Sequence, residues 1–248
     1  MRRRRILAAM AASPLLARPR GAHSADPLGD TVPAPDDFVF TANPLPAVKA
    51  ALDKHALTVM AIVGPMTASA EARDPTLTYP ALLISRLKAA WPDVGVQSAV
   101  LPIVRMDATL FRANLAAGLG QKTPNLVLWG AGGTAAARGD DLASFHAQLA
   151  DTIAAIRAAG ADLILMTPQY APMVARLMNL PPYRDAVLKE AQEAGVPVLD
   201  RYDLMRYWSD NGILDLDAAA QATQISVAHT ANAWIARLLA DGIVRAVA

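Results

Sequence analysis

Five short, mainly apolar runs of residues alternate along the chain with segments of helical spacing, and this alternation constrains the fold more than any other feature. The runs span residues 57–63, 94–100, 125–129, 162–166 and 196–199. Most of their residues are apolar, which is typical of strands buried on both faces. Strands of this kind, joined by helices, form a parallel sheet covered on both sides. We therefore predict a three-layer αβα fold.

Helical spacing separates the runs, and several of the expected helix ends carry a recognisable signal. Expected helices cover residues 79–91, 107–119, 183–194 and 230–244, and a longer one runs from a cap at Asp140 or Asp141 to Gly160. Asp favours the position that caps a helix start, and Gly tolerates the left-handed backbone that ends one. We predict a doubly wound, flavodoxin-like parallel sheet of five strands, in which ligands bind beyond the carboxyl ends of the strands.

The first 24 residues have the composition of an export signal. Arg2–Arg5 precede the apolar segment Ile6–Ala17, and Ala22-His23-Ser24 offers small residues where a signal peptidase cleaves. We interpret residues 1–24 as a signal peptide for either the general or the twin-arginine route; a misassigned start codon is the alternative. An apolar segment of about twelve residues is too short to cross a bilayer, so no stable membrane anchor is expected. The chain is expected to be exported, periplasmic or secreted.

The rest of the chain divides into a tether and one domain. Residues 25–46 contain five prolines and few large apolar side chains, which is typical of an extended tether. Residues 47–248 are long enough for one well-buried α/β domain.

Charge and cysteine content exclude several classes of function. Six arginines lie within the first 20 residues, which leaves 17 basic and 22 acidic residues in the remainder. An acidic body has no electrostatic reason to bind nucleic acid. The absence of cysteine excludes disulfides, thiolate zinc sites and iron–sulfur clusters. His55, His146 and His229 are far apart and show no metal-ligand spacing, so neither a metal nor a cofactor is expected.

Several segments near the ends of the predicted strands carry a family resemblance. They are Gly64, Thr78-Tyr79-Pro80-Ala81, Leu126-Val127-Leu128-Trp129-Gly130, Gln169-Tyr170-Ala171-Pro172, the stretch from Val198 to Trp208, and His229. Together they resemble the SGNH (GDSL-type) hydrolase superfamily, in its exported bacterial branch, over residues 57–243. The resemblance implies an ancestral esterase with a serine after the first strand, a glycine and an asparagine that bind the oxyanion, and a late Asp-x-x-His pair.

The first two catalytic blocks of this chain depart from that pattern. The serine position falls on Pro65 or Met66, neither of which carries a hydroxyl. In the second block, residues 101–106, bulky residues stand where the glycine is expected. Loss of a triad nucleophile costs about 10⁶ in turnover, so efficient hydrolysis by the usual route of the superfamily is not expected.

The last two blocks are also altered. Thr134 stands at the asparagine position, or Gly133 if the alignment shifts by one residue. Ser226 replaces the aspartate, so His229 is the one main functional side chain that is kept. A histidine base without its carboxylate is less well oriented, and its cation is less well supported.

The candidate site residues follow from this comparison. The candidate catalytic residues are His229 as a base and Ser69 or Thr67 as a relocated nucleophile. Each also has an ordinary structural interpretation, as a packed histidine or a hydroxyl at a helix entry. The candidate ligand-binding residues are Thr134, Gly132, Arg105 and Gln169. Arg105 offers a fork of donors to an anionic or sugar-like ligand, or forms a salt bridge, and Gly132 serves a tight turn or a ligand.

The function that we expect is non-catalytic. The chain is predicted to bind an acylated sugar or surface glycan, or to assist envelope polysaccharide-synthesis or acyltransfer proteins. One alternative is an active esterase or deacetylase that uses the relocated nucleophile. A second alternative is a structural partner in an envelope complex that binds no small ligand.

Overall fold

A computed structural model describes residues 31–35, 38, 43–64, 74–103 and 107–248. Its centre is a five-stranded sheet in the order β2-β1-β3-β4-β5, with every neighbouring pair parallel. The strands are β1 (Ala56–Val63), β2 (Gly95–Pro102), β3 (Leu126–Gly130), β4 (Asp162–Met166) and β5 (Val198–Leu199). This is the flavodoxin-like order, so the predicted doubly wound parallel sheet is confirmed.

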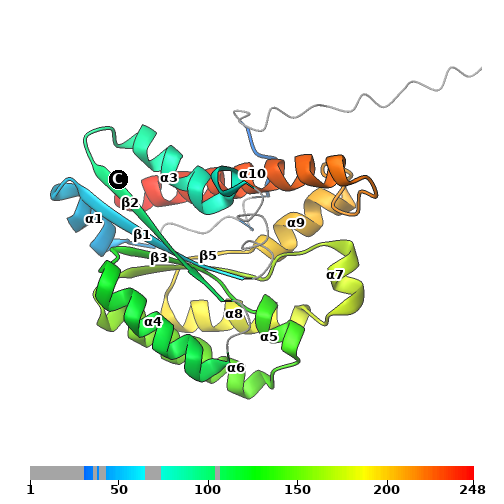
Figure 1. Cartoon of the computed structure of the whole chain (residues 1–248), viewed down its shortest axis with the longest axis horizontal. Coiled ribbons are helices and arrows are strands. Elements are labelled where there is room, and N and C mark those ends of the chain that lie inside the picture. The colour runs from blue at the N-terminus through cyan, green and yellow to red at the C-terminus, as the bar shows by residue number, and fades with distance from the viewer. Residues whose placement is uncertain (1–30, 36–37, 39–42, 65–73, 104–106) are drawn as a thin grey trace, which may run out of the picture.

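Helices cover both faces of the sheet, which gives the predicted three layers (Figure 1). One layer holds α1 (Pro46–Asp53), α3 (Tyr79–Ala90), α9 (Arg201–Asp210) and α10 (Gln221–Val247). The other holds α4 (Ala108–Lys122), α5 (Gly133–Arg138), α6 (Leu142–Ala158) and α8 (Pro181–Ala194). The short elements η2 (Pro75–Leu77) and α7 (Pro172–Leu177) complete the described part of the chain.

The side chains of β1 explain why its sequence is apolar at every position except Thr58. Val59, Ala61 and Val63 belong to the core on the α3–α10 side of the sheet. Met60 and Ile62 belong to the core on the α4–α6 side. Successive side chains of a strand point to opposite faces, so a strand between two helical layers needs an apolar residue at every buried position, and the one polar residue of β1, Thr58, is only half-buried.

The predicted helix ends agree with the structure at several caps. The Asp141 carboxylate accepts a hydrogen bond of 2.9 Å from the Ser144 backbone N–H, and α6 begins at the next residue, Leu142. Gly160 follows the C-cap of α6 with a φ of 75°, and Gly195 ends α8 with a φ of 62°. Of the two candidate caps for this helix, Asp141 is therefore the cap.

The last helix differs from the sequence prediction. It begins at Gln221, nine residues before the predicted start at Thr230. Most residues from 221 to 229 are exposed, so their side chains form no apolar stripe that would mark them as helical. Ser226 and His229 therefore lie within α10 rather than before it.

The described part of the N-terminal segment packs on the domain. The Pro33 carbonyl accepts a hydrogen bond of 2.6 Å from Trp208 Nε1, and the Phe38 carbonyl accepts one of 3.2 Å from the Asp200 backbone N–H. Val32, Ala34 and Phe38 contact the core on the α3–α10 side. The predicted signal peptide, residues 1–24, lies outside the described residues. Within the described ranges, no helix has the length and hydropathy needed to span a membrane.

Candidate functional site

A concave feature with an apolar lining lies at the carboxyl edge of the sheet. It is a cavity of about 330 Å³ where β1, β3 and β4 end, at Gly64, Gly130 and Thr167. After β1 the chain crosses to the edge strand β2 and then returns to β3, so strand order reverses between β1 and β3. Doubly wound sheets bind their ligands at this point, which makes the cavity the candidate site.

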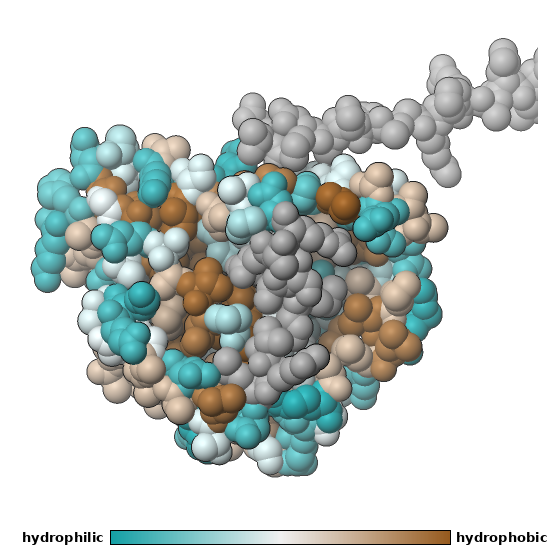
Figure 2. Space-filling model, viewed as in Figure 1, coloured by the Kyte–Doolittle hydropathy of each residue, from teal (hydrophilic) through white to brown (hydrophobic). Residues whose placement is uncertain are grey.

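Apolar side chains form much of the cavity wall. Ile62 and Val63 come from the end of β1, and Val174 and Met178 come from α7 and the residue after it. Leu180 adds a further apolar side chain just before α8. The short helix α7 also exposes two large apolar residues, Met173 (58% exposed) and Leu177 (76% exposed). Figure 2 shows this as a hydrophobic area on the side of the molecule where α7 lies.

Thr134, in the third sequence block, lies beside Gly64, which begins the first block. A Cβ placed on Gly64 would stand 3.6 Å from Thr134 Oγ1, so this hydroxyl lies directly against the residue that follows β1. Thr134 and Gly64 both line the cavity. Thr134 and Gly64 are therefore neighbours at this edge of the sheet, and the ligand-binding role of Thr134 stays a prediction.

Gly132 has a conformational reason for being glycine. Its φ is +90°, and a Cβ there would stand 2.8 Å from Pro168 Cγ and 3.3 Å from Tyr183 Cβ. L side chains rarely adopt this backbone conformation, and a proline ring cannot move aside. Gly132 thus permits the close approach of the β3–α5 turn to Pro168, a residue of the cavity wall.

We expect Gly132→Ala to lower the free energy of unfolding by about 2–3 kcal/mol, because backbone strain and the contact with Pro168 act together. Gly133→Ala is the matched control: its Cβ meets nothing within 4 Å and its φ is not positive, so a change within about 0.5 kcal/mol is expected. Urea unfolding of the two variants checks this. Equal losses in both variants would contradict the role given to Gly132.

Arg201 is the most unusual residue of the cavity wall. It is 6% exposed, and it is the first residue of α9. Its Nη2 donates to Gln169 Oε1, and its guanidinium carbon lies 5.7 Å from the centroid of the Tyr79 ring. Its Nε has no hydrogen-bond partner among the described residues. Burial lowers the pKa of Arg201, and the interaction with Tyr79 opposes that shift.

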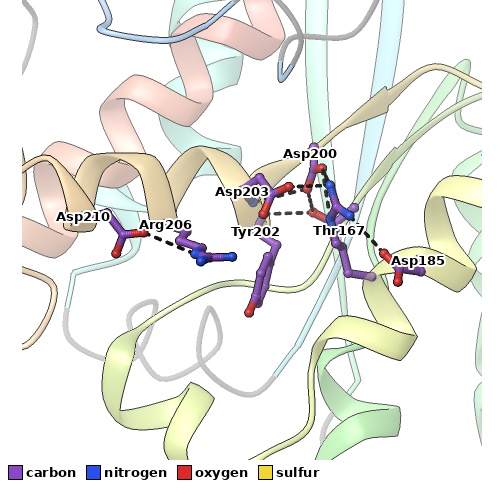
Figure 3. A network of polar contacts seen from close by, with 8 residues as sticks. Thr167, Asp185, Asp200, Tyr202, Asp203, Arg206 and Asp210 are labelled. Atoms are coloured by element: carbon purple, nitrogen blue, oxygen red, sulfur yellow. Dashed lines mark hydrogen bonds and ion pairs between the residues drawn. The ribbon is translucent and has the colours of Figure 1, made fainter.

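A polar network fixes the start of α9 and hence the position of Arg201 (Figure 3). Asp200, 6% exposed, accepts a hydrogen bond of 2.8 Å from Thr167 Oγ1 and one of 3.1 Å from Arg184 Nε. Thr167 Oγ1 in turn accepts a bond of 2.9 Å from the Tyr202 backbone N–H. The network therefore ties the end of β4 to α8 and to the N-terminus of α9.

The charges of this network perturb one another. Burial raises the pKa of Asp203, and the negative charge of Asp200 raises it further, while Arg184 lowers it. Burial acts to lower the pKa of Arg184, but hydrogen bonds and charges from Asp200, Asp185 and Asp203 raise it overall. Arg184 is thus held as a cation between three carboxylates, two of which it contacts across the α8–α9 junction.

A second groove adjoins the cavity. It measures about 350 Å³ and lies between α7, α9 and α10. Gln169, Val174 and Arg201 line both spaces, so these residues form the wall between them. The groove also has several polar side chains: Asp215, Asp217, Gln224 and Asn232.

The structure separates the sequence-predicted residues into three groups. Thr134 and Gln169 line the cavity, and Gly132 packs beside it. His229 is half-buried on α10, is not a lining residue of the cavity, and lies on the side of η2. Thr67, Ser69 and Arg105, like Pro65 and Met66, lie outside the described residues. The roles assigned to all of these residues stay predictions.

His229 lies close enough to Asp74 for its charge to affect the pKa of that carboxyl group. Hydrogen bonds from Thr76 are the main reason that the pKa of Asp74 is lowered, and the charge of His229 adds a smaller effect. Ser226, at the aspartate position, is exposed, and its carbonyl accepts a hydrogen bond of 3.1 Å from Thr230.

Metal-ligating side chains do not gather in the part of the chain that the structure describes: no three His, Asp or Glu residues there are close enough to hold an ion.

Fold and sequence comparisons define the class of protein. The cavity lies at the strand ends of a doubly wound parallel sheet, which agrees with the SGNH (GDSL-type) resemblance of the sequence. The sequence pattern of the non-GDSL lipase-like family matches residues 31–248, and the chain belongs to this family. A search of the curated proteins found no match.

Several solved structures share the fold. The structure titled TesA is 22% identical, with a TM-score of 0.52 over 70% of this chain and 94% of its own. A catalytic mutant of Axe2, an acetylxylan esterase from Geobacillus stearothermophilus, is 18% identical, with a TM-score of 0.55 over 77% and 94%. A two-domain esterase active on acetylated mannans is 13% identical, with a TM-score of 0.64 over 85% of this chain and 56% of its own.

Proposed function

We propose that this protein is an exported, non-hydrolytic member of its family that binds the acyl group of an acylated carbohydrate. The observation that carries the proposal is a contrast at one place. Gly64 is followed by Pro65 and Met66, which offer no nucleophilic hydroxyl at the position where the superfamily has its serine. Gly64 itself nevertheless borders an apolar cavity. An acyl-enzyme needs a nucleophile and its base, whereas binding needs only the cavity.

The two adjoining spaces support an acylated carbohydrate as the ligand class. An acyl group fits the apolar cavity beside Val63 and Met178. The neighbouring groove offers Gln224 and Asn232, whose amides donate to and accept from sugar hydroxyls. Two of the structural relatives are esterases, one an acetylxylan esterase and the other active on acetylated mannans.

The purified mature chain is expected to show no reaction with a fluorophosphonate probe and no acetyl-ester turnover above that of a His229→Ala variant. A missing nucleophile costs about 10⁶ in turnover, so any residual activity should not depend on the histidine. The matched control is His55→Ala, which replaces an exposed histidine in the turn just before β1. Mass spectrometry of the labelled protein and release of acetate from acetylated xylan measure the two quantities.

The opposite result has a definite meaning. Labelling at Ser69 or Thr67, together with loss of turnover only in His229→Ala, would establish the active-esterase alternative. Absence of both hydrolysis and binding to acetylated oligosaccharides would favour the structural partner. Mass measurement of the chain recovered from the periplasm tests export, and we expect a new N-terminus near Ala25.

A further inference from the structure

The guanidinium of Arg201 is enclosed on most sides but is incompletely hydrogen-bonded. The Tyr79 ring covers one face, and the amide oxygen of Gln169 accepts from Nη2. Nε is buried and has no partner among the described residues, and none of the ion pairs found in that part of the chain includes Arg201. Burying a guanidinium without an anion is costly, and an unpaired buried donor requires an explanation.

The unpartnered donor lies on the edge that best accepts an anion. Nε and Nη2 share one edge of the guanidinium, where a carboxylate binds with two parallel hydrogen bonds. In this structure Gln169 Oε1 accepts from Nη2, one of the two donors that a carboxylate would bind. An arriving carboxylate would displace a neutral amide oxygen and bind both donors, and it would supply the negative charge that the site lacks.

We propose that Arg201 binds the carboxylate of a small aliphatic acid whose hydrocarbon chain lies in the cavity. Arg201 itself lines the cavity, and so do Ile62, Val174 and Met178. These three apolar side chains suit a hydrocarbon chain better than a polar sugar ring. The inference rests on the proposed function only in placing an aliphatic group in the same space. The ligand it specifies is the free acid, not the ester.

The charge distribution favours one negative charge on an apolar body. The groove on the other side of Arg201 carries Asp215 and Asp217, which oppose further negative charge there. Asp217 is already paired with Arg176 at 3.0 Å. A phosphate would place additional negative charge against these carboxylates. An acidic oligosaccharide would also place polar surface against the apolar wall of the cavity. An aliphatic acid avoids both.

Calorimetric titration with octanoate tests the proposal directly. At pH 7 the mature chain is expected to bind octanoate at least tenfold more tightly than methyl octanoate or octan-1-ol, because hydrogen bonds to charged groups are the stronger ones. Equal or tighter binding of the methyl ester would overturn the proposal, and so would failure to bind octanoate.

Two substitutions distinguish a ligand anchor from a structural arginine. Gln169→Glu is nearly isosteric and places a carboxylate of the chain itself on Arg201, so it should abolish the preference for octanoate while raising the melting temperature. Arg201→Met should also abolish the preference. If Arg201→Met does not fold, Gln169→Glu still decides, because it keeps the arginine; a preference that survives in Gln169→Glu would refute the proposal.

Arg206→Met is the matched control. Arg206 lies on the same helix, its side chain is 57% exposed, and it pairs with Asp210 rather than with the cavity. Its removal should leave the preference for octanoate unchanged. Titration with acetylated xylo-oligosaccharides separates this inference from the proposed function. Binding of these sugars without octanoate binding removes only the inference, whereas octanoate binding without sugar binding removes only the carbohydrate role.

Discussion

Replacing Trp208 with alanine is expected to lower the free energy of unfolding by about 4 kcal/mol, within the range for truncating a buried aromatic residue. Trp208 is fully buried in the core on the α3–α10 side. Its ring meets Trp234 of α10 edge-on, with 5.0 Å between the ring centroids. The truncation would leave a cavity between α9 and α10 and would remove this aromatic contact.

The indole N–H of Trp208 adds a second effect that a different substitution isolates. It donates to the Pro33 carbonyl, so it links the N-terminal segment to α9. Trp208→Phe keeps much of the buried ring and removes this donor. The half-buried Pro33 carbonyl can still meet water, so a loss of about 1–2 kcal/mol is expected. Urea unfolding followed by far-ultraviolet circular dichroism measures both variants without depending on tryptophan fluorescence. Similar losses in the two variants would contradict cavity formation as the main cost.

The sheet was predictable because its inner strands β1, β3 and β4 are buried on both faces. A strand such as β1 must present apolar side chains to two helical layers, and that requirement leaves a continuous apolar run in the sequence. Glycines with positive φ, such as Gly160 and Gly195, marked helix ends for a similar reason: the backbone conformation restricts the residue type. In both cases one physical requirement acts on residues that are adjacent in the sequence.

The helices that the sequence did not predict have no such local requirement. α5 and α7 have six residues each, too few to show a helical period. The first turns of α10 are exposed, so no apolar stripe records them. Where helices are short or solvated, tertiary contacts rather than periodicity determine the backbone.

The candidate site was predictable only in part. Thr134 and Gln169 follow β3 and β4, and the carboxyl ends of parallel strands share one edge of the sheet, which is why both reach the cavity. Arg201 was missed, because an arginine after a helix cap resembles any solvated residue of a first turn. The available signal was its place directly after β5 and Asp200, at the same edge. Its burial depends on Tyr79 and Gln169, which are distant in the sequence.

Replacing Asp200 with alanine is the second large effect that we expect, a loss of about 3–4 kcal/mol of unfolding free energy. The Asp200 side chain is 8% exposed and pairs with Arg184 at 2.5 Å, and Arg184 is itself only 24% exposed. Arg184 keeps Asp203 and Asp185 as partners but loses its most buried carboxylate, and loss of that buried pair is the largest contribution. The substitution also removes the N-cap of α9 and the acceptor of the Thr167 hydroxyl.

Asp185→Ala provides the control, because Asp185 pairs with the same arginine but is 66% exposed. Exposed ion pairs contribute about 0–1 kcal/mol, so this variant should unfold almost as the parent does. Asp200→Asn separates charge from shape: it keeps an oxygen that can cap α9 and accept from Thr167, and it should lose less than Asp200→Ala. Because Asp200 precedes Arg201, both Asp200 variants should also weaken octanoate binding, whereas Asp185→Ala should not. An Asp185→Ala variant as unstable as Asp200→Ala would show that the exposed pair, and not the buried carboxylate, holds the start of α9.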